Sequence, residues 1–208
     1  MRALVAAGAF ALLLAGSPMA IACEGSVGLL NDTFDALSPI WSATTDISVD
    51  DGKLEINTRP DKSEKITADP KFGDIDACAD VIVVKASDLA AAYVGIGFWM
   101  TDNANLYTFQ ITLDGYAGVY RLSHDKWDTL IKDKQSSSIV TGIGSVNTIR
   151  VVTVGNQATF YINGDKFDTL TGTPPDDGQH VGFVVEGPEK ESATFKFDDM
   201  NVTYPEGQ

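Results

Sequence analysis

The chain has 208 residues, of which 44% are hydrophobic, and it carries 29 acidic against 15 basic side chains, for a formal net charge of −14. A surface this acidic repels phosphate backbones and anionic lipids. Nucleic acid and membrane surfaces are therefore poor candidate partners. The length suits one all-β domain, since such domains reach 200 residues or more without dividing.

The N-terminus has the pattern of a signal peptide. Arg2 supplies a positive charge, residues 3–15 are apolar, and small residues at 20–22 offer a cleavage site. The apolar run is shorter than the roughly 20 residues that a membrane span needs, and no second such run follows. We therefore expect a signal peptide at residues 1–22 and a single soluble domain at residues 23–208, secreted or periplasmic.

Two cysteines remain after the expected cleavage, Cys23 and Cys78. In an oxidising compartment they predict one disulfide that ties the mature N-terminus to a strand. The alternative is that Cys23 is the lipidated first residue of a lipoprotein, but Ala20 stands where that signal usually has leucine. Two isolated cysteines do not make a closed zinc site, which needs four ligands.

The first half of the chain predicts strands joined by short turns. Residues 31–41 predict a short edge strand, and the Asp-Gly pair at residues 51–52 predicts a hairpin turn. Residues 64–72 predict a second edge strand, because Pro70 cannot donate to a ladder. Residues 76–86 become continuously apolar, as expected of a central strand.

Residues 93–100 and 107–113 predict neighbouring strands that build a shallow trough. Strict alternation puts two glycines and two aromatic rings on one face of the first strand, namely Tyr93, Gly95, Gly97 and Trp99. Glycine has no side chain to fill that face, so a trough is left. The second strand puts Thr108, Gln110 and Thr112 on its polar face, and Tyr107, Phe109, Ile111 and Leu113 on its core face.

The trough is a candidate sugar site. Trp99 is predicted to be a stacking platform, with Gln110 and Thr112 as hydrogen-bond partners on the next strand. Arg121 and Trp127 border the same face if consecutive strands are neighbours. The alternatives are that Trp99 packs under a loop and that Arg121 is a surface ion-pair partner. No catalytic residue is assigned.

Residues 147–170 predict an antiparallel meander, since Gly155-Asn156 and Asn163-Gly164 separate three runs rich in β-branched and aromatic residues. Residues 181–185 and 193–202 predict closing strands. About a dozen strands without a long helical pattern predict an all-β fold, an antiparallel two-sheet jelly-roll sandwich.

Several segments together resemble a known family: FQITLDGYAGVYRL, KWDTL, VNTIRVV, VGNQATFYINGDKF, VGFVVEG and FKFDDMNV. In this order they are similar to concanavalin A-like lectin and glucanase jelly rolls, and most similar to the bacterial 3-keto-disaccharide hydrolase, or family-sixteen-like, branch. The resemblance covers about residues 34–202. It implies a jelly roll and a link to sugars, but fold does not fix function.

The E-x-D-x-x-E strand of family-sixteen glucanases is absent from this chain. Retaining hydrolysis needs two carboxyl groups about 5–5.5 Å apart. Glu55, Glu64 and Glu186 are the main glutamates in expected strands, and none has an acidic partner two or four residues on. A laminarinase-type mechanism is therefore not expected, and enzymatic activity stays open.

Acidic pairs lie near the two ends of the domain: Asp32 and Asp35, and Asp198 and Asp199. If the first and last strands pair, these carboxylates meet, and calcium is the cation that takes many oxygen ligands. The alternative is ordinary surface acid, with no cofactor. The leading functional hypothesis is carbohydrate or glycoconjugate binding at the trough. The alternatives are a hydrolase of the 3-keto-disaccharide type and a structural or protein-interaction module without a small ligand.

Overall fold

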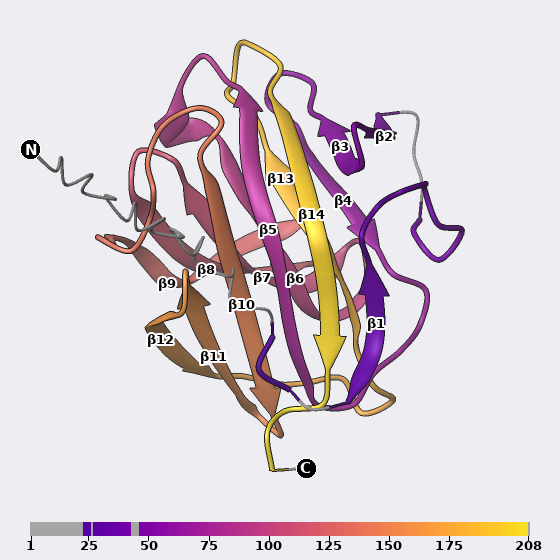
Figure 1. The fold of residues 1–208 in the computed structure, drawn as a ribbon. Coiled ribbons are helices and arrows are strands. Elements are labelled where there is room, and N and C mark those ends of the chain that lie inside the picture. Colours follow the sequence, from indigo (N-terminus) through magenta and orange to yellow (C-terminus); the bar gives the residue numbers. More distant parts are fainter. Residues whose placement is uncertain (1–22, 26, 43–45, 208) are drawn as a thin grey trace, which may run out of the picture.

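The computed structural model describes residues 23–25, 27–42 and 46–207, so the expected signal peptide at residues 1–22 lies outside the described residues. The described part forms a sandwich of two antiparallel sheets, which confirms the predicted fold class (Figure 1). Its strands are β1 (Gly28–Asp32), β2 (Ile47–Asp50), β3 (Lys53–Asn57), β4 (Ser63–Thr67), β5 (Ile75–Lys85), β6 (Tyr93–Asp102), β7 (Asn105–Thr112), β8 (Tyr116–Ser123), β9 (Lys126–Gln135), β10 (Val146–Val154), β11 (Gln157–Ile162), β12 (Asp165–Thr171), β13 (His180–Glu186) and β14 (Thr194–Thr203). One short 3-10 turn, η1 (Leu89–Ala91), precedes β6. No helix among the described residues is long and apolar enough to cross a membrane.

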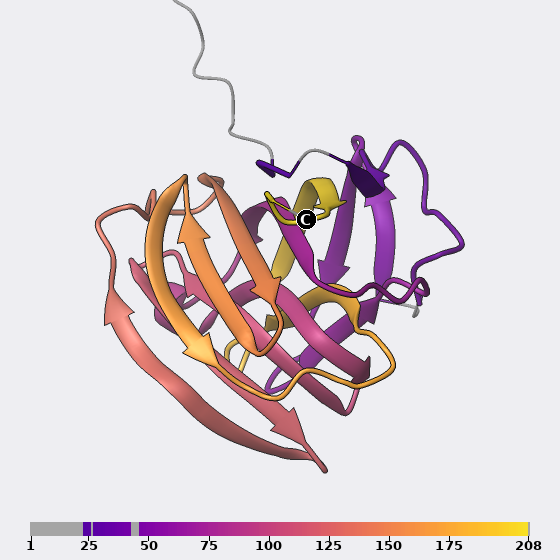
Figure 2. The same ribbon diagram turned by 90° about the horizontal axis from the view of Figure 1, so that it is seen from below.

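The eight-stranded sheet has the order β12-β11-β10-β5-β14-β3-β2, and β1 pairs with β14 beside this path. The six-stranded sheet has the order β4-β13-β6-β7-β8-β9. Figure 2 shows the two layers facing each other. Strand β5 lies between β10 and β14, and β4 lies at an edge, so the predicted central strand and second edge strand are both confirmed.

The predicted meander of β10, β11 and β12 is confirmed. Asn163 and Gly164 have φ of 51° and 87°, and Gly155 has φ of 54°. These positive values match a turn whose twist follows that of the flanking strands. The local sequence therefore determines these hairpins.

Aromatic rings from both sheets meet in the core. Phe183 on β13 stacks on Phe197 of β14 with ring centroids 4.0 Å apart, and Phe109 on β7 lies 5.0 Å from Phe160 on β11. All four side chains are fully buried. Burial of these aromatic side chains is a major contribution to the free energy that holds the two sheets together.

The prediction of an edge strand over residues 31–41 is wrong beyond β1, which ends at Asp32. The rest of this segment folds over one end of the core. Trp41 is 3% exposed, stacks 5.4 Å from Phe183, and donates its indole N–H to Asp32 Oδ2 at 2.7 Å. Burial of the Trp41 ring and its hydrogen bond to Asp32 hold this segment over the core instead of in the sheet.

The predicted position of Trp99 is also wrong. Strand β6 has a register shift between Phe98 and Asp102, and Trp99 has φ of +44°. The extra residue of a bulge reverses the alternation, so Trp99 turns into the core and is 2% exposed. Met100 instead points outward into a small buried cluster with Leu106, Leu122 and Val184. The Trp99 backbone N–H is held by Gln179 Oε1 at 2.8 Å.

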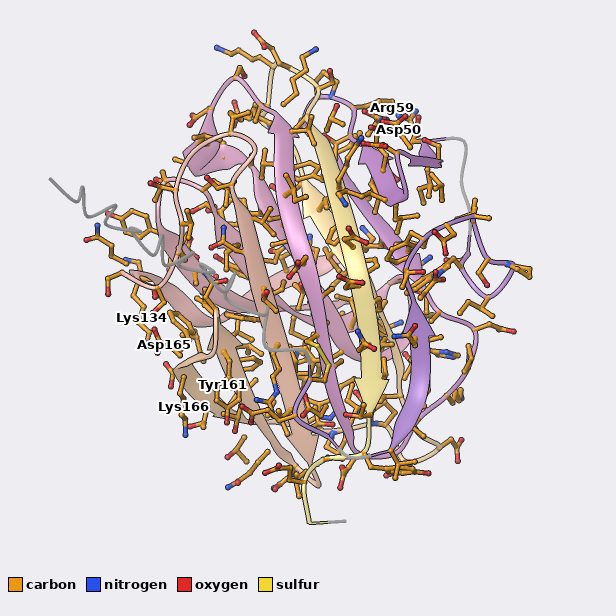
Figure 3. All side chains as sticks on the ribbon, in the orientation of Figure 1. Asp50, Arg59, Lys134, Tyr161, Asp165 and Lys166 are labelled. Atoms are coloured by element: carbon orange, nitrogen blue, oxygen red, sulfur yellow. A yellow bond between two sulfur atoms is a disulfide. The ribbon has the colours of Figure 1, made fainter. Side chains whose placement is uncertain are left out.

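The predicted disulfide between Cys23 and Cys78 is confirmed. Next to it, Glu24 pairs with Arg150 at 2.8 Å, and Arg150 pairs with buried Asp76 at 2.7 Å. A sulfur in a disulfide is not available for a lipid thioether, so the lipoprotein alternative does not fit this structure. Tyr161, labelled in Figure 3, lies on the outer face of the eight-stranded sheet. The Arg150 guanidinium lies over its ring, 4.7 Å from the centroid.

Candidate functional site

The outer face of the six-stranded sheet carries a hollow of about 290 Å³, which we call the outer hollow. Five strands contribute to it: β6, β7, β8, β9 and β13. The residues that line it are Tyr93, Gln110, Tyr120, Trp127, Thr129, Asp133 and Glu186.

Alternation along the strands explains why these side chains share a face. On β7, Phe109 and Ile111 point into the core, so Gln110 between them points outward. Gln110 is flanked in register by Gly95 on β6 and Gly118 on β8. The neighbouring strands therefore place no side chain beside Gln110. The predicted space next to Gln110 exists, although Trp99 does not border it.

Gln110 is 4% exposed, yet its side-chain amide makes no hydrogen bond within the described part of the chain. The amide faces the hollow, so its donor and its acceptor are open to solvent or to a ligand. Gln110 thus presents both a donor and an acceptor to whatever occupies the hollow.

Two tyrosines bind one carboxylate at the opposite wall. Tyr93 Oη donates to Asp133 Oδ2 at 3.1 Å, Tyr120 Oη donates to Asp133 Oδ1, and the two rings meet edge to face at 6.1 Å. A Cβ on Gly118 would lie 2.4 Å from Asp133 Oδ1 and 2.7 Å from Tyr120 Oη, so only glycine leaves room for this pairing. Burial and the Asp133 charge raise the pKa of Tyr93 to about 12, and they raise the pKa of Tyr120 further.

Glu186 lines the outer hollow on the β13 side, and Lys65 lies on the neighbouring strand β4, where it is paired in register with Val184. Partial desolvation, and then the nearby charge of Asp61, raise the pKa of the Glu186 carboxyl, while Lys65 acts in the opposite direction. Burial lowers the pKa of Lys65, against the effect of Glu64, Glu186 and Asp125.

Trp127 lines the outer hollow as well, and it is 38% exposed. Of the five residues predicted to bind a ligand, Gln110 and Trp127 lie together there. Thr112 is on the same face, but it is buried and its hydroxyl donates to Asp114 at 2.6 Å. Thr112 thus has no free donor for a ligand.

Trp99 and Arg121 lie elsewhere, at a rim cavity of about 350 Å³ that they line with Tyr107. Arg121 donates to Asp128 at 2.9 Å, which matches the alternative of an ion pair. Neither the Trp99 Nε1 nor the Arg121 Nε has a hydrogen-bond partner in the described residues. Four of the five predicted residues are therefore divided between the outer hollow and the rim cavity, and Thr112 lines neither of them.

The sequence reasoning missed Tyr120, Thr129 and Asp133. Thr129 and Asp133 stand at even spacings from Trp127, which is a period-2 signal that was available. The β8–β9 register has two irregularities, however, so counting every second residue does not identify which side chains of this hairpin share a face.

The predicted pairing of the first and last strands is confirmed, since Asp32 on β1 lies opposite Met200 on β14. The four aspartates still do not form a metal site. Asp32 accepts hydrogen bonds from Trp41 and Phe34, and Asp198 pairs with Lys53. Asp35 binds Thr33, and Asp199 has a raised pKa because of burial and the charge of Asp198. Nowhere in the described ranges do three or more His, Cys, Asp or Glu side chains gather as a metal would need.

No protein-family model matches the chain, and no curated protein matches it. Many solved structures share its architecture, which is the concanavalin A-like fold of carbohydrate-binding modules, lectins and glucanases.

Three of these structures illustrate the likeness. A carbohydrate-binding module from Bacillus subtilis is 11% identical, with a TM-score of 0.59, over 83% of this chain and 94% of that one. A Bacillus licheniformis β-glucanase is 10% identical, with a TM-score of 0.60, over 85% and 98%. A Bacteroides ovatus family-sixteen protein in complex with a glucan product is 11% identical, with a TM-score of 0.63, over 84% and 99%. At these identities the likeness establishes the fold alone.

Proposed function

We propose that this protein binds a carbohydrate or glycoconjugate in the outer hollow. The observation that carries the proposal is Gln110, a side chain only 4% exposed whose amide has no partner among the described residues and faces a hollow walled by aromatic rings. A hydroxyl of a sugar satisfies both the donor and the acceptor of such an amide.

The walls of the hollow suit the same ligand. Tyr93, Tyr120 and Trp127 offer apolar ring surface for the C–H faces of a sugar, and Thr129 and Glu186 offer polar atoms at its edge. The solved structures of similar fold include a carbohydrate-binding module and a carbohydrate recognition domain. Their likeness supports the proposal by analogy of fold.

A secreted or periplasmic location is part of this proposal. The Cys23–Cys78 disulfide is typical of an oxidising compartment, and glycans are the ligands met there.

Hydrolysis is a second candidate because Glu186, with its raised pKa, and Asp133 line the same hollow. A raised pKa suits a general acid. Binding is favoured over hydrolysis because both oxygens of Asp133 already accept tyrosine hydroxyls, which leaves it a poor nucleophile. If the protein is a hydrolase, incubation with the bound glycan releases shorter products and Glu186→Gln abolishes this release. If it only binds, the glycan is recovered intact.

The proposal is tested by screening the mature protein against a glycan array and measuring the hits by calorimetry, with Gln110→Leu as the diagnostic variant. Leucine fills the same space without polar atoms. We expect Gln110→Leu to lose at least about tenfold in glycan affinity while its free energy of unfolding changes by less than about 1 kcal/mol.

The matched control is Gln157→Leu, an exposed glutamine on β11 in the other sheet. It should leave affinity unchanged. Full affinity in Gln110→Leu, or the absence of any glycan ligand, would overturn the proposed site.

A further inference from the structure

Among the described residues, the carboxylates of the outer hollow form no ion pair. Neither Asp133 nor Glu186 has a basic nitrogen within 4.0 Å in the described part of the chain, whereas Asp168, Asp128 and Asp198 elsewhere each have one. Asp133 receives two hydroxyl hydrogen bonds, but these leave its charge unneutralised.

The surroundings strengthen this negative field. The charge of Asp61 acts on Glu186, and that of Asp133 acts on both tyrosines. Lys65 is the basic group near this wall, and its ammonium donates to Ser63 Oγ at 2.9 Å instead of forming a close ion pair. Charges in a partly desolvated hollow are costly unless the occupant neutralises them.

Three aromatic rings frame the same space. Tyr93 and Tyr120 meet edge to face, and Trp127 completes the wall. Faces of aromatic rings attract ammonium groups, and cages of such rings are a known way to bind cations in proteins. Carboxylates beside the rings add to that attraction.

We propose that the ligand class of the outer hollow is a glycan that bears a protonated amine, such as a glucosamine oligomer, with the ammonium held between Asp133, Glu186 and the aromatic wall. The inference rests on the proposed function of the same hollow and adds the charge of the ligand to it. Gln110 binds the sugar hydroxyls in this arrangement, and the two carboxylates select the amine.

The test compares three oligosaccharides of equal length by calorimetry at mildly acidic pH: glucosamine, N-acetylglucosamine and glucose oligomers. Acetylation removes the charge and keeps the ring. We expect the glucosamine oligomer to bind about tenfold more tightly than the other two, a difference of about 1.4 kcal/mol.

Three variants locate the selectivity. Asp133→Asn and Glu186→Gln should bring the glucosamine affinity down to that of the neutral oligomers, and Lys65→Met should raise it by removing a repelling charge. Asp177→Asn, an equal change of charge on an exposed loop, controls for general attraction by the acidic protein and should have no effect. Glu186 is exposed at a strand end, so its variant is expected to fold even if Asp133→Asn does not.

The outcomes separate the two proposals. Neutral oligomers that bind as well as glucosamine, with loss of affinity in Gln110→Leu, would overturn the amine inference and leave the glycan site standing. A loss of glucosamine preference in Asp177→Asn equal to that in Glu186→Gln would reduce the effect to general charge and also overturn it. Failure of all oligomers and of the glycan array would overturn both.

Discussion

Gln110 and Trp99 were both predicted to bind the ligand, and the structure treats them in opposite ways. Gln110 could be placed from the sequence because β7 alternates without interruption between the core and the outer face. Its lack of a hydrogen-bond partner was not predictable, because that depends on Gly95 and Gly118 from two other strands. Trp99 was misplaced because one bulged residue reverses the alternation.

The tyrosine pair provides a prediction at this scale. The pKa of Tyr93 is about 12 in the folded protein, against about 10 for an exposed tyrosine. The raised value means that the fold favours the neutral ring. The resulting stabilisation is complete below about pH 10 and is lost as the pH rises from about 10 to about 12.

Two measurements check this. A spectroscopic titration should show that Tyr93→Phe removes a group that ionises near pH 12. Asp133→Asn should lower the pKa of Tyr93, because the negative charge of Asp133 is then absent. Urea unfolding at increasing alkaline pH should show stability falling over the same range. Ionisation of every tyrosine near pH 10 would contradict the buried network.

At the scale of single elements, the bulge in β6 places Trp99 in the core, so Trp127 is the tryptophan that lines the outer hollow. Trp99 packs within the core, with its ring centroid 5.2 Å from that of Tyr107. A Cβ on Gly172 would lie 2.3 Å from the Trp99 ring, so the chain directly after β12 packs closely against the indole. Turn residues identify hairpins from local sequence, but a bulge held by the side chain of Gln179, 80 residues away, is a tertiary effect.

The two tryptophans therefore form a matched pair. Trp99→Ala should lower the free energy of unfolding by about 3–5 kcal/mol, because it leaves a large cavity, and should leave the glycan affinity of the folded protein unchanged. Trp127→Ala should change the free energy of unfolding by no more than about 1 kcal/mol, because Trp127 is 38% exposed. It should lower the glycan affinity, because Trp127 lines the outer hollow. Urea unfolding and calorimetry on both variants check this. If Trp99→Ala loses glycan affinity but keeps its free energy of unfolding, the glycan site lies at the rim cavity and not at the outer hollow.

At the scale of the whole molecule, hairpin spacing, alternation and the two cysteines were sufficient to predict the sandwich and its disulfide. The sequence could not show that Asp32 binds Trp41 or that Asp198 pairs with Lys53, and so it suggested a calcium site that the described residues do not form. Acidic composition alone does not say which carboxylates meet.

The disulfide fastens the N-terminal segment to the eight-stranded sheet. It joins residues 55 positions apart, and breaking it gives the unfolded chain more freedom. Reduction, or the double variant Cys23→Ser with Cys78→Ser, should lower the free energy of unfolding by about 2–4 kcal/mol. Urea unfolding with and without reductant measures this. Glycan affinity should persist in the reduced protein, because the outer hollow lies on the other sheet.

The central claim is that a glycan occupies the outer hollow, and titration of isotope-labelled protein followed by NMR tests it most directly. The three tryptophans give separate indole signals, and each reports on a different place: Trp127 on the outer hollow, Trp99 on the rim cavity and Trp41 on the end of the core. With a glycan identified by the array, we expect the Trp127 indole and the Gln110 side-chain amide to shift together while Trp41 and Trp99 stay in place. Shifts at Trp99 with Gln110 unmoved would contradict the account.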